Sequence, residues 1–276
     1  METAKKIRVS MLQMSSIVGD IEANCKKIEN LLSSEKENFT DVLVLPEVWT
    51  VGWACDKFVG SAENISDSRV IEFLSNLAKK YNINIIGGSV ITKSSDKFYN
   101  TCPVVSRSGE LIDTYSKMHL FSYYGCNEGN YITPGNSPVM VEIDGVNFGL
   151  SICYDIRFPE IYRAYRKSNA DILVNCAAWG ASKPIPWEMM TKSRAIENQC
   201  YMIALTQCGH IENQEYNLGE SRIIDYKGEE ISSIMHDEGI VTATLDMDSM
   251  YDFRNKCTIL NDIKDNYEVK CYAKVY

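Results

Sequence analysis

Hydrophobic residues recur along this chain with two alternating periods, one typical of strands and one typical of helices. Residues 7–11 alternate between apolar and polar side chains, which predicts a half-exposed strand. Residues 20–32 repeat their apolar positions at near-helical spacing, and Asp20 is a suitable N-cap for that helix. The run 41–45 is apolar after its first residue and ends at Pro46, as a buried strand does. The same patterns predict helices at 68–81, 159–167 and 187–199, and strands at 83–90, 171–176, 200–206 and 240–245.

Turns that contain glycine join three further pairs of short strands. Asp144-Gly145 is a two-residue turn of the kind that favours a tight hairpin. Strands, hairpins and helices in this mixture predict an α/β fold with mixed sheets and helices outside them. The paired strands are 100–106 with 111–117, 139–143 with 146–153, and the two halves of 221–234.

Nothing in the sequence divides the chain into separate parts. It contains no linker rich in proline, glycine or serine, no low-complexity stretch and no obvious internal repeat. We therefore expect a single domain over residues 1–276. The tail 250–276 has weaker periodicity than the rest, and we interpret it as an arm that could reach a partner subunit.

The net charge argues against two classes of partner. The 28 Lys and Arg residues and 37 Asp and Glu residues give a formal net charge of −9. A surface this acidic repels nucleic acid and anionic membranes. No segment reaches the roughly 18 consecutive apolar residues of a membrane span. The N-terminus has no apolar run of signal-peptide length, so the cytoplasm is the expected location.

The cysteines and histidines do not have the spacing of a metal site. The ten cysteines are spread from Cys25 to Cys271 without a C-x-x-C pair, and the three histidines are far apart. Most of these thiols are expected to be reduced, and most to be buried as small apolar residues. Glycine-rich phosphate loops and the dinucleotide-binding turn are also absent from the sequence. We therefore expect no metal and no cofactor.

Three reactive side chains directly follow predicted strands. Glu47 follows the run 41–45, Lys117 ends a hairpin strand, and Cys153 ends another. Ligands bind at strand ends in open α/β sheets, so the three groups could converge on one site. A thiol, a carboxylate that accepts its proton and an ammonium that stabilises an oxyanion together suit acyl transfer through a thioester. Taken singly, each residue is more often a solvated glutamate, a surface lysine or a core cysteine.

The segments that carry these residues resemble the signature motifs of the nitrilase superfamily of carbon–nitrogen hydrolases. Leu45-Pro46-Glu47 is similar to an L-P-E motif, 115–121 to Y-x-K-x-H-L-F, and 149–160 to G-x-x-I-C-Y-D-x-R-F-P-E. Further similarity runs through 194–199 and 221–225, so the resemblance covers nearly the whole chain. It implies a single-domain, four-layer α-β-β-α sandwich, usually dimerised or further oligomerised through the nucleophile-bearing region.

The resemblance also implies a role for each matched residue. Cys153 would be the nucleophile and Glu47 the general base. Lys117 and the backbone N–H of Tyr154 would stabilise the oxyanion. A second family glutamate maps onto Glu128, where it would orient Lys117 or assist proton transfer.

The form C-Y-D-x-R resembles the amidase branches of the superfamily. In ω-amidases and related members, an arginine four residues after the nucleophile grips the substrate carboxylate, and this position is Arg157 here. An aromatic residue at the position of Trp179 forms a pocket wall in the same branch. The resemblance therefore implies hydrolysis of the distal amide of a short dicarboxylic acid monoamide, such as α-ketoglutaramate or α-ketosuccinamate, with release of ammonia. In the alternative interpretation, Arg157 pairs with Asp155 or Glu160 and never contacts the substrate.

Two departures from the family pattern leave other functions open. Pro186-Trp187-Glu188 replaces the commoner H-W-E, and the loop 209–219 is unusually polar. The same catalytic residues would serve a deaminated-glutathione amidase or an N-carbamoyl amino acid hydrolase. An acyltransferase that passes the thioester to an amine, and a catalytically silent scaffold of the same fold, are the remaining alternatives. The intact set of Glu47, Lys117 and Cys153 argues against the silent scaffold.

Overall fold

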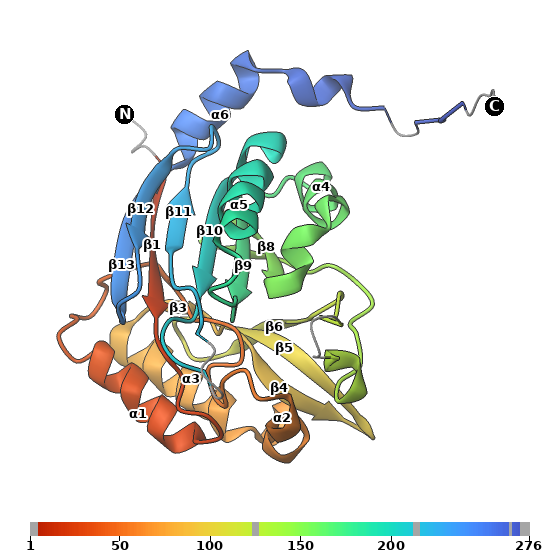
Figure 1. The fold of residues 1–276 in the computed structure, drawn as a ribbon. Coiled ribbons are helices and arrows are strands. Elements are labelled where there is room, and N and C mark those ends of the chain that lie inside the picture. Colours follow the sequence, from red (N-terminus) through yellow and green to blue (C-terminus); the bar gives the residue numbers. More distant parts are fainter. Residues whose placement is uncertain (1–4, 123–126, 212–215, 265–266, 271–276) are drawn as a thin grey trace, which may run out of the picture.

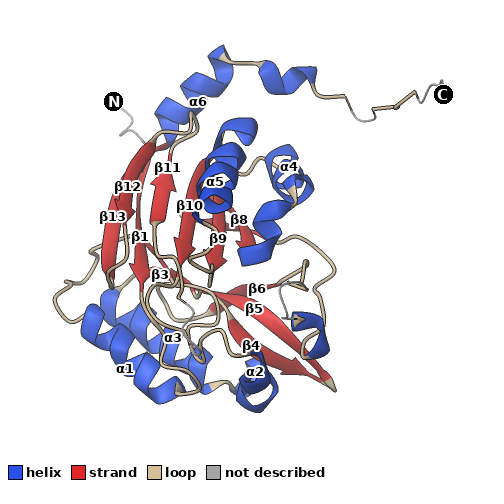
Figure 2. Cartoon of the chain, viewed as in Figure 1, coloured by secondary structure: helices blue, strands red, loops and turns tan. Residues whose placement is uncertain are grey.

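Two β-sheets lie between two pairs of helices (Figure 1). The computed structural model describes residues 5–122, 127–211, 216–264 and 267–270. In Figure 2 the strands lie between α1 (Ile21–Leu31) and α3 (Arg69–Tyr81) on one side and α4 (Pro159–Lys167) and α5 (Pro184–Asn198) on the other. The predicted four-layer α-β-β-α sandwich is therefore confirmed.

The first sheet combines strands from the first half of the chain with the last strand. Its strands are β1 (Lys6–Gln13), β2 (Val42–Val44), β3 (Asn84–Ile86), β4 (Val90–Ser94), β5 (Lys97–Val105), β6 (Leu111–Ser116) and β13 (Gly239–Asp246). Hydrogen bonds join them in the order β13-β1-β2-β3-β5-β4, and β6 also pairs with β5. Strands β1, β2 and β3 run parallel, so their C-terminal ends lie at the same edge.

The second sheet is formed by strands from the second half of the chain. They are β7 (Met140–Ile143), β8 (Val146–Ile152), β9 (Ile172–Ala177), β10 (Tyr201–Thr206), β11 (Ser221–Ile224) and β12 (Glu230–Ile234). Their order is β12-β11-β10-β9-β8-β7, and β8, β9 and β10 run parallel. The hairpins predicted at 139–153 and 221–234 form β7–β8 and β11–β12 of this sheet.

The side chains of β2 explain how the layers pack. Val42 and Val44 belong to the hydrophobic core that residues of both sheets share. Leu43 and Leu45 belong to a second core, formed with the apolar faces of α1 and α3. Because successive strand residues point to opposite faces, a strand covered on both faces is apolar throughout. This is why the run 41–45 shows no polar alternation.

Local signals set the first residue of several helices. The side chain of Asp20 accepts a hydrogen bond of 2.9 Å from the backbone N–H of Ala23, which confirms the predicted N-cap of α1. Ser68 caps α3 in the same way, through a 3.1 Å bond from the N–H of Ile71. Pro184 begins α5 three residues before the predicted start, at a position where the N–H that proline lacks is not needed.

The remaining helical elements were not predicted from periodicity. They are α2 (Cys55–Ser61), α6 (Met247–Lys256) and the 3₁₀ turns η1 (Ile65–Asp67), η2 (Glu128–Asn130), η3 (Cys153–Arg157) and η4 (Ile259–Asp262). Most span fewer than two turns, too short for an apolar period to emerge. Beyond α6 the tail runs away from the sandwich (Figure 1), and its residues 265–266 and 271–276 are not among those described. No described helix has both the length and the apolar character needed to cross a bilayer.

The strand predicted at 83–90 is wrong in its extent. The structure instead has the short strand β3 and then β4, with Gly87 and Gly88 between them. Gly88 has a φ of +65°, and a Cβ atom there would lie 2.0 Å from the carbonyl oxygen of Pro46. The strand therefore ends where the chain passes very close to the residue before Glu47, an approach that only glycine permits.

Candidate active site

Three strand ends converge where the two sheets meet. Glu47 lies just after β2, while Lys117 and Cys153 directly follow β6 and β8. Two hydrogen bonds join the backbone of Glu47 to the second sheet. Its N–H donates to the carbonyl oxygen of Ala177 at 3.4 Å, and its carbonyl accepts from Gln207 Nε2 at 2.7 Å. Glu47 is thus held between the first sheet, which carries it, and the second, which carries Cys153.

Two carboxylates and one ammonium form a fully buried cluster at this point. Lys117 Nζ lies 2.8 Å from Glu47 Oε1 and 2.9 Å from Glu128 Oε2, and none of the three side chains is exposed. The N–H of Ala178 donates to Glu47 Oε2 at 2.8 Å, and the N–H of Phe121 donates to Glu128 Oε2 at 2.9 Å. Each buried carboxylate is therefore held by an ion pair and a backbone hydrogen bond, as buried charges require.

Asn100 is a member of this cluster that the sequence analysis missed. Its Nδ2 donates to Glu47 Oε1 at 2.9 Å and to Glu128 Oε1 at 3.2 Å, so one amide links the two carboxylates. Its backbone carbonyl accepts from the N–H of Lys117 at 2.8 Å. The sequence did offer one signal, a polar residue within the predicted hairpin strand 100–106. A buried asparagine needs hydrogen-bond partners, so its position pointed to other polar groups nearby.

The charges and their burial shift the proton affinities of the cluster. Burial, and then the neighbouring Glu128, raise the pKa of Glu47 although Lys117 opposes the shift. Burial alone would lower the pKa of Lys117, but the two carboxylates outweigh it and raise that pKa well above its usual value. Burial and the charge of Glu47 raise the pKa of the Cys153 thiol well above its usual value. The resting site therefore holds a protonated thiol beside a carboxylate that is more basic than an exposed glutamate.

The backbone turn at Cys153 places this residue between the buried cluster and the pocket that it lines. Cys153 has a φ of +45°, a conformation that residues other than glycine rarely adopt and that often marks functional sites. The N–H of Ile152 donates to Asp155 Oδ2 at 2.9 Å, and Asn175 Nδ2 donates to the carbonyl oxygen of Cys153 at 3.4 Å. The residue is 7% exposed, whereas Glu47 behind it is fully buried.

Asp155 connects this turn to the strand end that carries Lys117. Its buried carboxylate accepts a 2.7 Å hydrogen bond from the hydroxyl of Tyr115 and a 3.0 Å bond from the backbone N–H of His119. The Nδ1 atom of His119 also lies 2.7 Å from it. Lys117 therefore stands between two residues that are anchored to the same carboxylate. This explains why the motif around Lys117 and the motif around Cys153 occur together.

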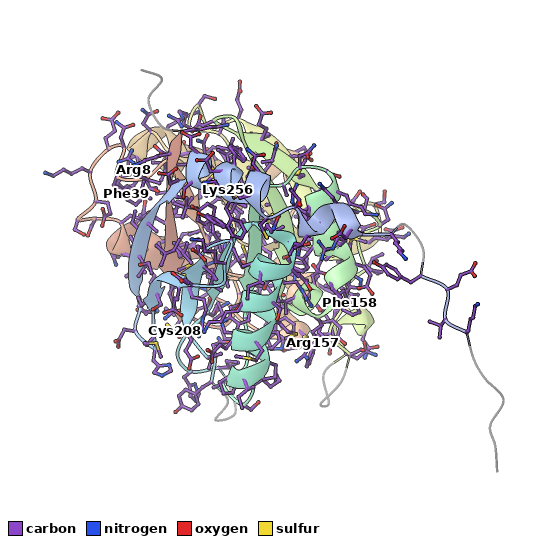
Figure 3. All side chains as sticks on the ribbon, turned by 90° about the horizontal axis from the view of Figure 1, so that it is seen from above. Arg8, Phe39, Arg157, Phe158, Cys208 and Lys256 are labelled. Atoms are coloured by element: carbon purple, nitrogen blue, oxygen red, sulfur yellow. The ribbon has the colours of Figure 1, made fainter. Side chains whose placement is uncertain are left out.

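A pocket of about 120 Å³ opens above Cys153. The guanidinium carbon of Arg157 lies 5.0 Å from the centre of the Trp179 ring. Figure 3 shows Arg157 beside α5, against which η3 packs. The pocket is walled by aromatic and cationic side chains, and its described lining residues are Trp53, Phe121, Cys153, Tyr154, Arg157, Ala178, Trp179, Gly180, Lys183 and Ile211.

The sequence profile of carbon–nitrogen hydrolases matches residues 8–255 of the chain. The chain belongs to the carbon–nitrogen hydrolase family. The match spans the buried cluster, the nucleophile turn and every described residue of the pocket. The family resemblance recognised in the three sequence motifs is therefore confirmed.

This carbon–nitrogen hydrolase is similar to several named proteins along nearly its whole length. It is 34% identical to the 2-oxoglutaramate amidase of Bacillus subtilis over 264 residues, which cover 95% of this chain and 100% of that protein. It is 32% identical to the omega-amidase NIT2 of Danio rerio, with 92% of each chain covered. The solved structure of Saccharomyces cerevisiae Nit3, a member of branch 10 of the nitrilase superfamily, matches with a TM-score of 0.83. That match has 29% identity over 92% of this chain and 94% of Nit3.

The structure of this carbon–nitrogen hydrolase brings together every site residue that the sequence singled out. Lys117 contacts both Glu47 and Glu128 directly. Pocket residues that the sequence analysis did not single out include Trp53, Phe121 and Lys183. No local pattern marks Trp53, in a loop, or Lys183, at a helix end, whereas Phe121 is the last residue of the motif 115–121. Four of the residues predicted for nucleophile, oxyanion and substrate contacts line the pocket, and they are Cys153, Tyr154, Arg157 and Trp179. Lys117, the other residue predicted for the oxyanion, lies in the buried cluster.

Replacing Asn100 with leucine is expected to move the acid limb of the pH–activity profile to higher pH. Without the shared amide, Glu47 and Glu128 lose a common donor, so ionisation of Glu47 becomes less favourable and its pKa rises further. We expect kcat at neutral pH to fall by about 10- to 100-fold, the scale of one lost hydrogen bond to a buried charge. Steady-state kinetics across pH would measure both effects.

Asn147→Leu is the matched control, because Asn147 is a half-buried asparagine at the opposite end of β8 from Cys153. It should leave the pH–activity profile unchanged. An Asn100→Leu enzyme with the wild-type acid limb would contradict the coupling between Asn100 and Glu47.

Proposed function

We propose that this protein is an ω-amidase, which hydrolyses the distal amide of a short dicarboxylic acid monoamide and releases ammonia. The observation that carries the proposal is the buried cluster of Glu47, Lys117 and Glu128 behind the Cys153 thiol, below a pocket that contains Arg157. The relatives named 2-oxoglutaramate amidase and omega-amidase, at 34% and 32% identity over most of the chain, support it. The substrates that fit are α-ketoglutaramate and α-ketosuccinamate.

The first half-reaction forms a thioester. The sulfur of Cys153 attacks the amide carbonyl carbon as its proton passes to Glu47. Lys117 Nζ and the backbone N–H of Tyr154, in the first turn of η3, stabilise the oxyanion that develops. The carbon–nitrogen bond then breaks, and Glu47 returns the proton to the leaving nitrogen, which departs as ammonia. Glu128 keeps Lys117 in position through both of its carboxylate oxygens.

The second half-reaction releases the acid. A water molecule gives a proton to Glu47 and attacks the thioester carbon, and the same two donors stabilise the second oxyanion. The carbon–sulfur bond breaks, and the proton on Glu47 returns to the sulfur of Cys153. The raised pKa of Glu47 suits a group that must both accept and donate this proton.

Arg157 binds the substrate carboxylate, and Trp179 forms the wall on which the guanidinium rests. The planar guanidinium offers two parallel hydrogen bonds to a carboxylate. Binding of the substrate carboxylate by Arg157 gives a function to a guanidinium that lines a pocket with aromatic walls.

The size of the pocket favours the small dicarboxylic monoamides over deaminated glutathione. At about 120 Å³ its volume is well below that of a typical drug-sized site, which is roughly 300–1,000 Å³. A tripeptide-sized substrate would have to extend beyond the described walls. A five-carbon monoamide places its carboxylate and its amide within one short chain.

The wild-type protein is expected to release ammonia from α-ketoglutaramate and α-ketosuccinamate, and not from butyramide, which lacks a carboxylate. The panel would also contain deaminated glutathione and N-carbamoyl-β-alanine, and ammonia would be measured with a coupled assay. Turnover of only deaminated glutathione or only N-carbamoyl-β-alanine would support the thioester mechanism but identify that compound as the substrate. A folded protein that hydrolyses none of the compounds would favour the silent scaffold.

The assembly that fits the exposed surface is a homodimer or a higher homo-oligomer in the cytoplasm. Helix α5 exposes the apolar side chains of Ile185, Met189 and Ile196, which are 71%, 50% and 48% exposed. Such a row on a helix next to the nucleophile turn suits burial against a second copy. The tail beyond α6 would be an arm that contacts the partner subunit. The free thiols of the described cysteines fit a reducing compartment.

A further inference from the structure

A buried polar cluster centred on Asn175 lies behind the nucleophile turn. Asn175 is on β9, directly beside Ser151 of β8, and Tyr162 is on α4, which lies next to these strands in Figure 1. The Nδ2 atom of Asn175 lies 3.0 Å from Ser151 Oγ, 3.2 Å from the Tyr162 hydroxyl and 3.4 Å from the carbonyl oxygen of Cys153. Asn175 is fully buried and is not among the residues that line the pocket, so it reaches the turn from the protein interior.

The protons of the two hydroxyl groups determine which end of the Asn175 amide faces the turn. Ser151 donates its single proton to the carbonyl oxygen of Val174 at 2.6 Å. Burial raises the pKa of Tyr162 above its usual value, so this hydroxyl keeps its proton and donates it to Ser151 Oγ at 2.6 Å. Neither hydroxyl has a proton left for Asn175, so both can only accept from it. The NH₂ end of the amide therefore faces the cluster, and it donates to the carbonyl oxygen of Cys153.

The carbonyl of Cys153 and the N–H of Tyr154 belong to the same peptide group. The described chain contains no cis peptide bond. In a trans peptide the C=O and N–H bonds lie in one plane and point in opposite directions. A donor that holds the carbonyl oxygen from the interior therefore directs the Tyr154 N–H away from the interior, toward the pocket that Tyr154 lines.

The hydrogen bond from Asn175 is expected to strengthen during the reaction. An oxyanion at the Tyr154 N–H polarises the peptide group and makes the carbonyl oxygen of Cys153 a better acceptor, since linked hydrogen bonds reinforce one another. A separation of 3.4 Å is long, and hydrogen bonds in active sites without substrate often tighten only in the transition state. An interaction that is stronger in the transition state than in the ground state raises kcat and leaves KM little changed.

We propose that Asn175 is a positioning residue that directs and polarises the Tyr154 N–H of the oxyanion site through the carbonyl group of Cys153. It acts from behind the turn and does not touch the substrate. This inference rests on the thioester mechanism of the proposed function, and it adds the group that orients one of the two oxyanion donors.

Two inhibitors of equal chain length separate the oxyanion site from the rest of the pocket. With the aldehyde 5-oxopentanoate, the sulfur of Cys153 forms a bond to the aldehyde carbon, and the π bond of the carbonyl opens to an oxyanion. The thiol proton passes to Glu47 and then to that oxygen, which completes a hemithioacetal. Pentanoate has the same carboxylate but a methyl group in place of the aldehyde, so it cannot use the oxyanion donors. Inhibition constants for both would be measured beside kcat and KM for α-ketoglutaramate.

The Asn175→Leu variant is expected to lose part of the oxyanion stabilisation. Its kcat should fall by about 10- to 100-fold with little change in KM, a smaller loss than the 10²- to 10³-fold that removal of an oxyanion donor costs. The inhibition constant of 5-oxopentanoate should rise by a similar factor, and that of pentanoate should stay the same. Asn175→Ala, which places no extra bulk against the turn, should show the same separation of the two constants even if the leucine variant does not fold.

Asn84→Leu is the matched control, because Asn84 is a buried asparagine at the start of β3 that donates to the carbonyl oxygen of Asp41 at 3.1 Å. It should lower the melting temperature and change neither inhibition constant. Wild-type kcat in the Asn175 variants would overturn the role of Asn175 and leave the ω-amidase function standing. A lower kcat with equal changes, or no change, in the two constants would do the same. A wild-type enzyme that neither hydrolyses α-ketoglutaramate nor is inhibited by 5-oxopentanoate would overturn the proposed function, and this inference with it.

Discussion

Replacing Cys153 with alanine is expected to lower kcat for α-ketoglutaramate by about 10⁴-fold or more, the scale found when a covalent nucleophile is removed from a hydrolase. Neither Glu47 nor Lys117 can replace the sulfur, because both side chains are fully buried behind it. The smaller side chain leaves a pocket that still binds substrate, so binding and turnover should separate. Ammonia release would measure turnover by the variant, and calorimetry would measure its binding of α-ketoglutaramate.

A second experiment on the same residue detects the intermediate. Wild type mixed with substrate and quenched in acid should carry an added acyl mass on the peptide that contains Cys153, and hydroxylamine should remove it. Cys257→Ala is the control, because Cys257 is a half-buried thiol at the end of α6. This variant should carry the same acyl mass on the Cys153 peptide as wild type. A Cys153→Ala enzyme that retains more than about a hundredth of wild-type kcat would contradict the nucleophile, since the expected loss is at least 10⁴-fold.

Replacing Glu47 with glutamine is expected to lower kcat by about 10²- to 10⁴-fold, the usual contribution of a general acid–base group. Glutamine has nearly the same shape, but it cannot accept the thiol proton. Wild-type activity should fall as the pH decreases through the raised pKa of Glu47, so the acid limb lies at higher pH than for an exposed glutamate. The variant should lack this limb, and pH profiles of kcat/KM for both enzymes would test it.

Alkylation of Cys153 by iodoacetamide distinguishes loss of the base from loss of the site. Glu47 raises the pKa of the thiol through its charge and through a hydrogen bond, so the glutamine variant should form thiolate more readily. Its Cys153 should react at least as fast as in wild type while turnover collapses. The control is Glu142→Gln, at an exposed position of β7, which should change neither rate. Slow alkylation together with lost binding of α-ketoglutaramate would indicate a damaged site, and a variant with wild-type turnover would contradict the base role.

Elements with a strong local signal could be predicted without the structure. The apolar run 41–45 and the cap at Asp20 correspond to β2 and α1, and the turn at Asp144-Gly145 joins β7 to β8. The cap and the turn depend on residues within a few positions of one another, and the unbroken apolar run is itself the mark of a strand covered on both faces. The prediction of one strand over 83–90 was wrong, because the break at Gly88 is caused by its close approach to Pro46, a residue 42 positions earlier.

The sequence by itself determined the layered α/β class of the fold and, through ordered motifs, the family. It also identified Glu47, Lys117 and Cys153 as reactive groups at strand ends, since this depends on their position along each strand. Only the tertiary structure decided which side chains meet. Lys117 and Glu47 are 70 positions apart in the chain, and Asn100 reaches both carboxylates because β5 pairs with β6. Such contacts depend on strand order and on how the two sheets pack, which no local pattern of hydrophobic residues encodes.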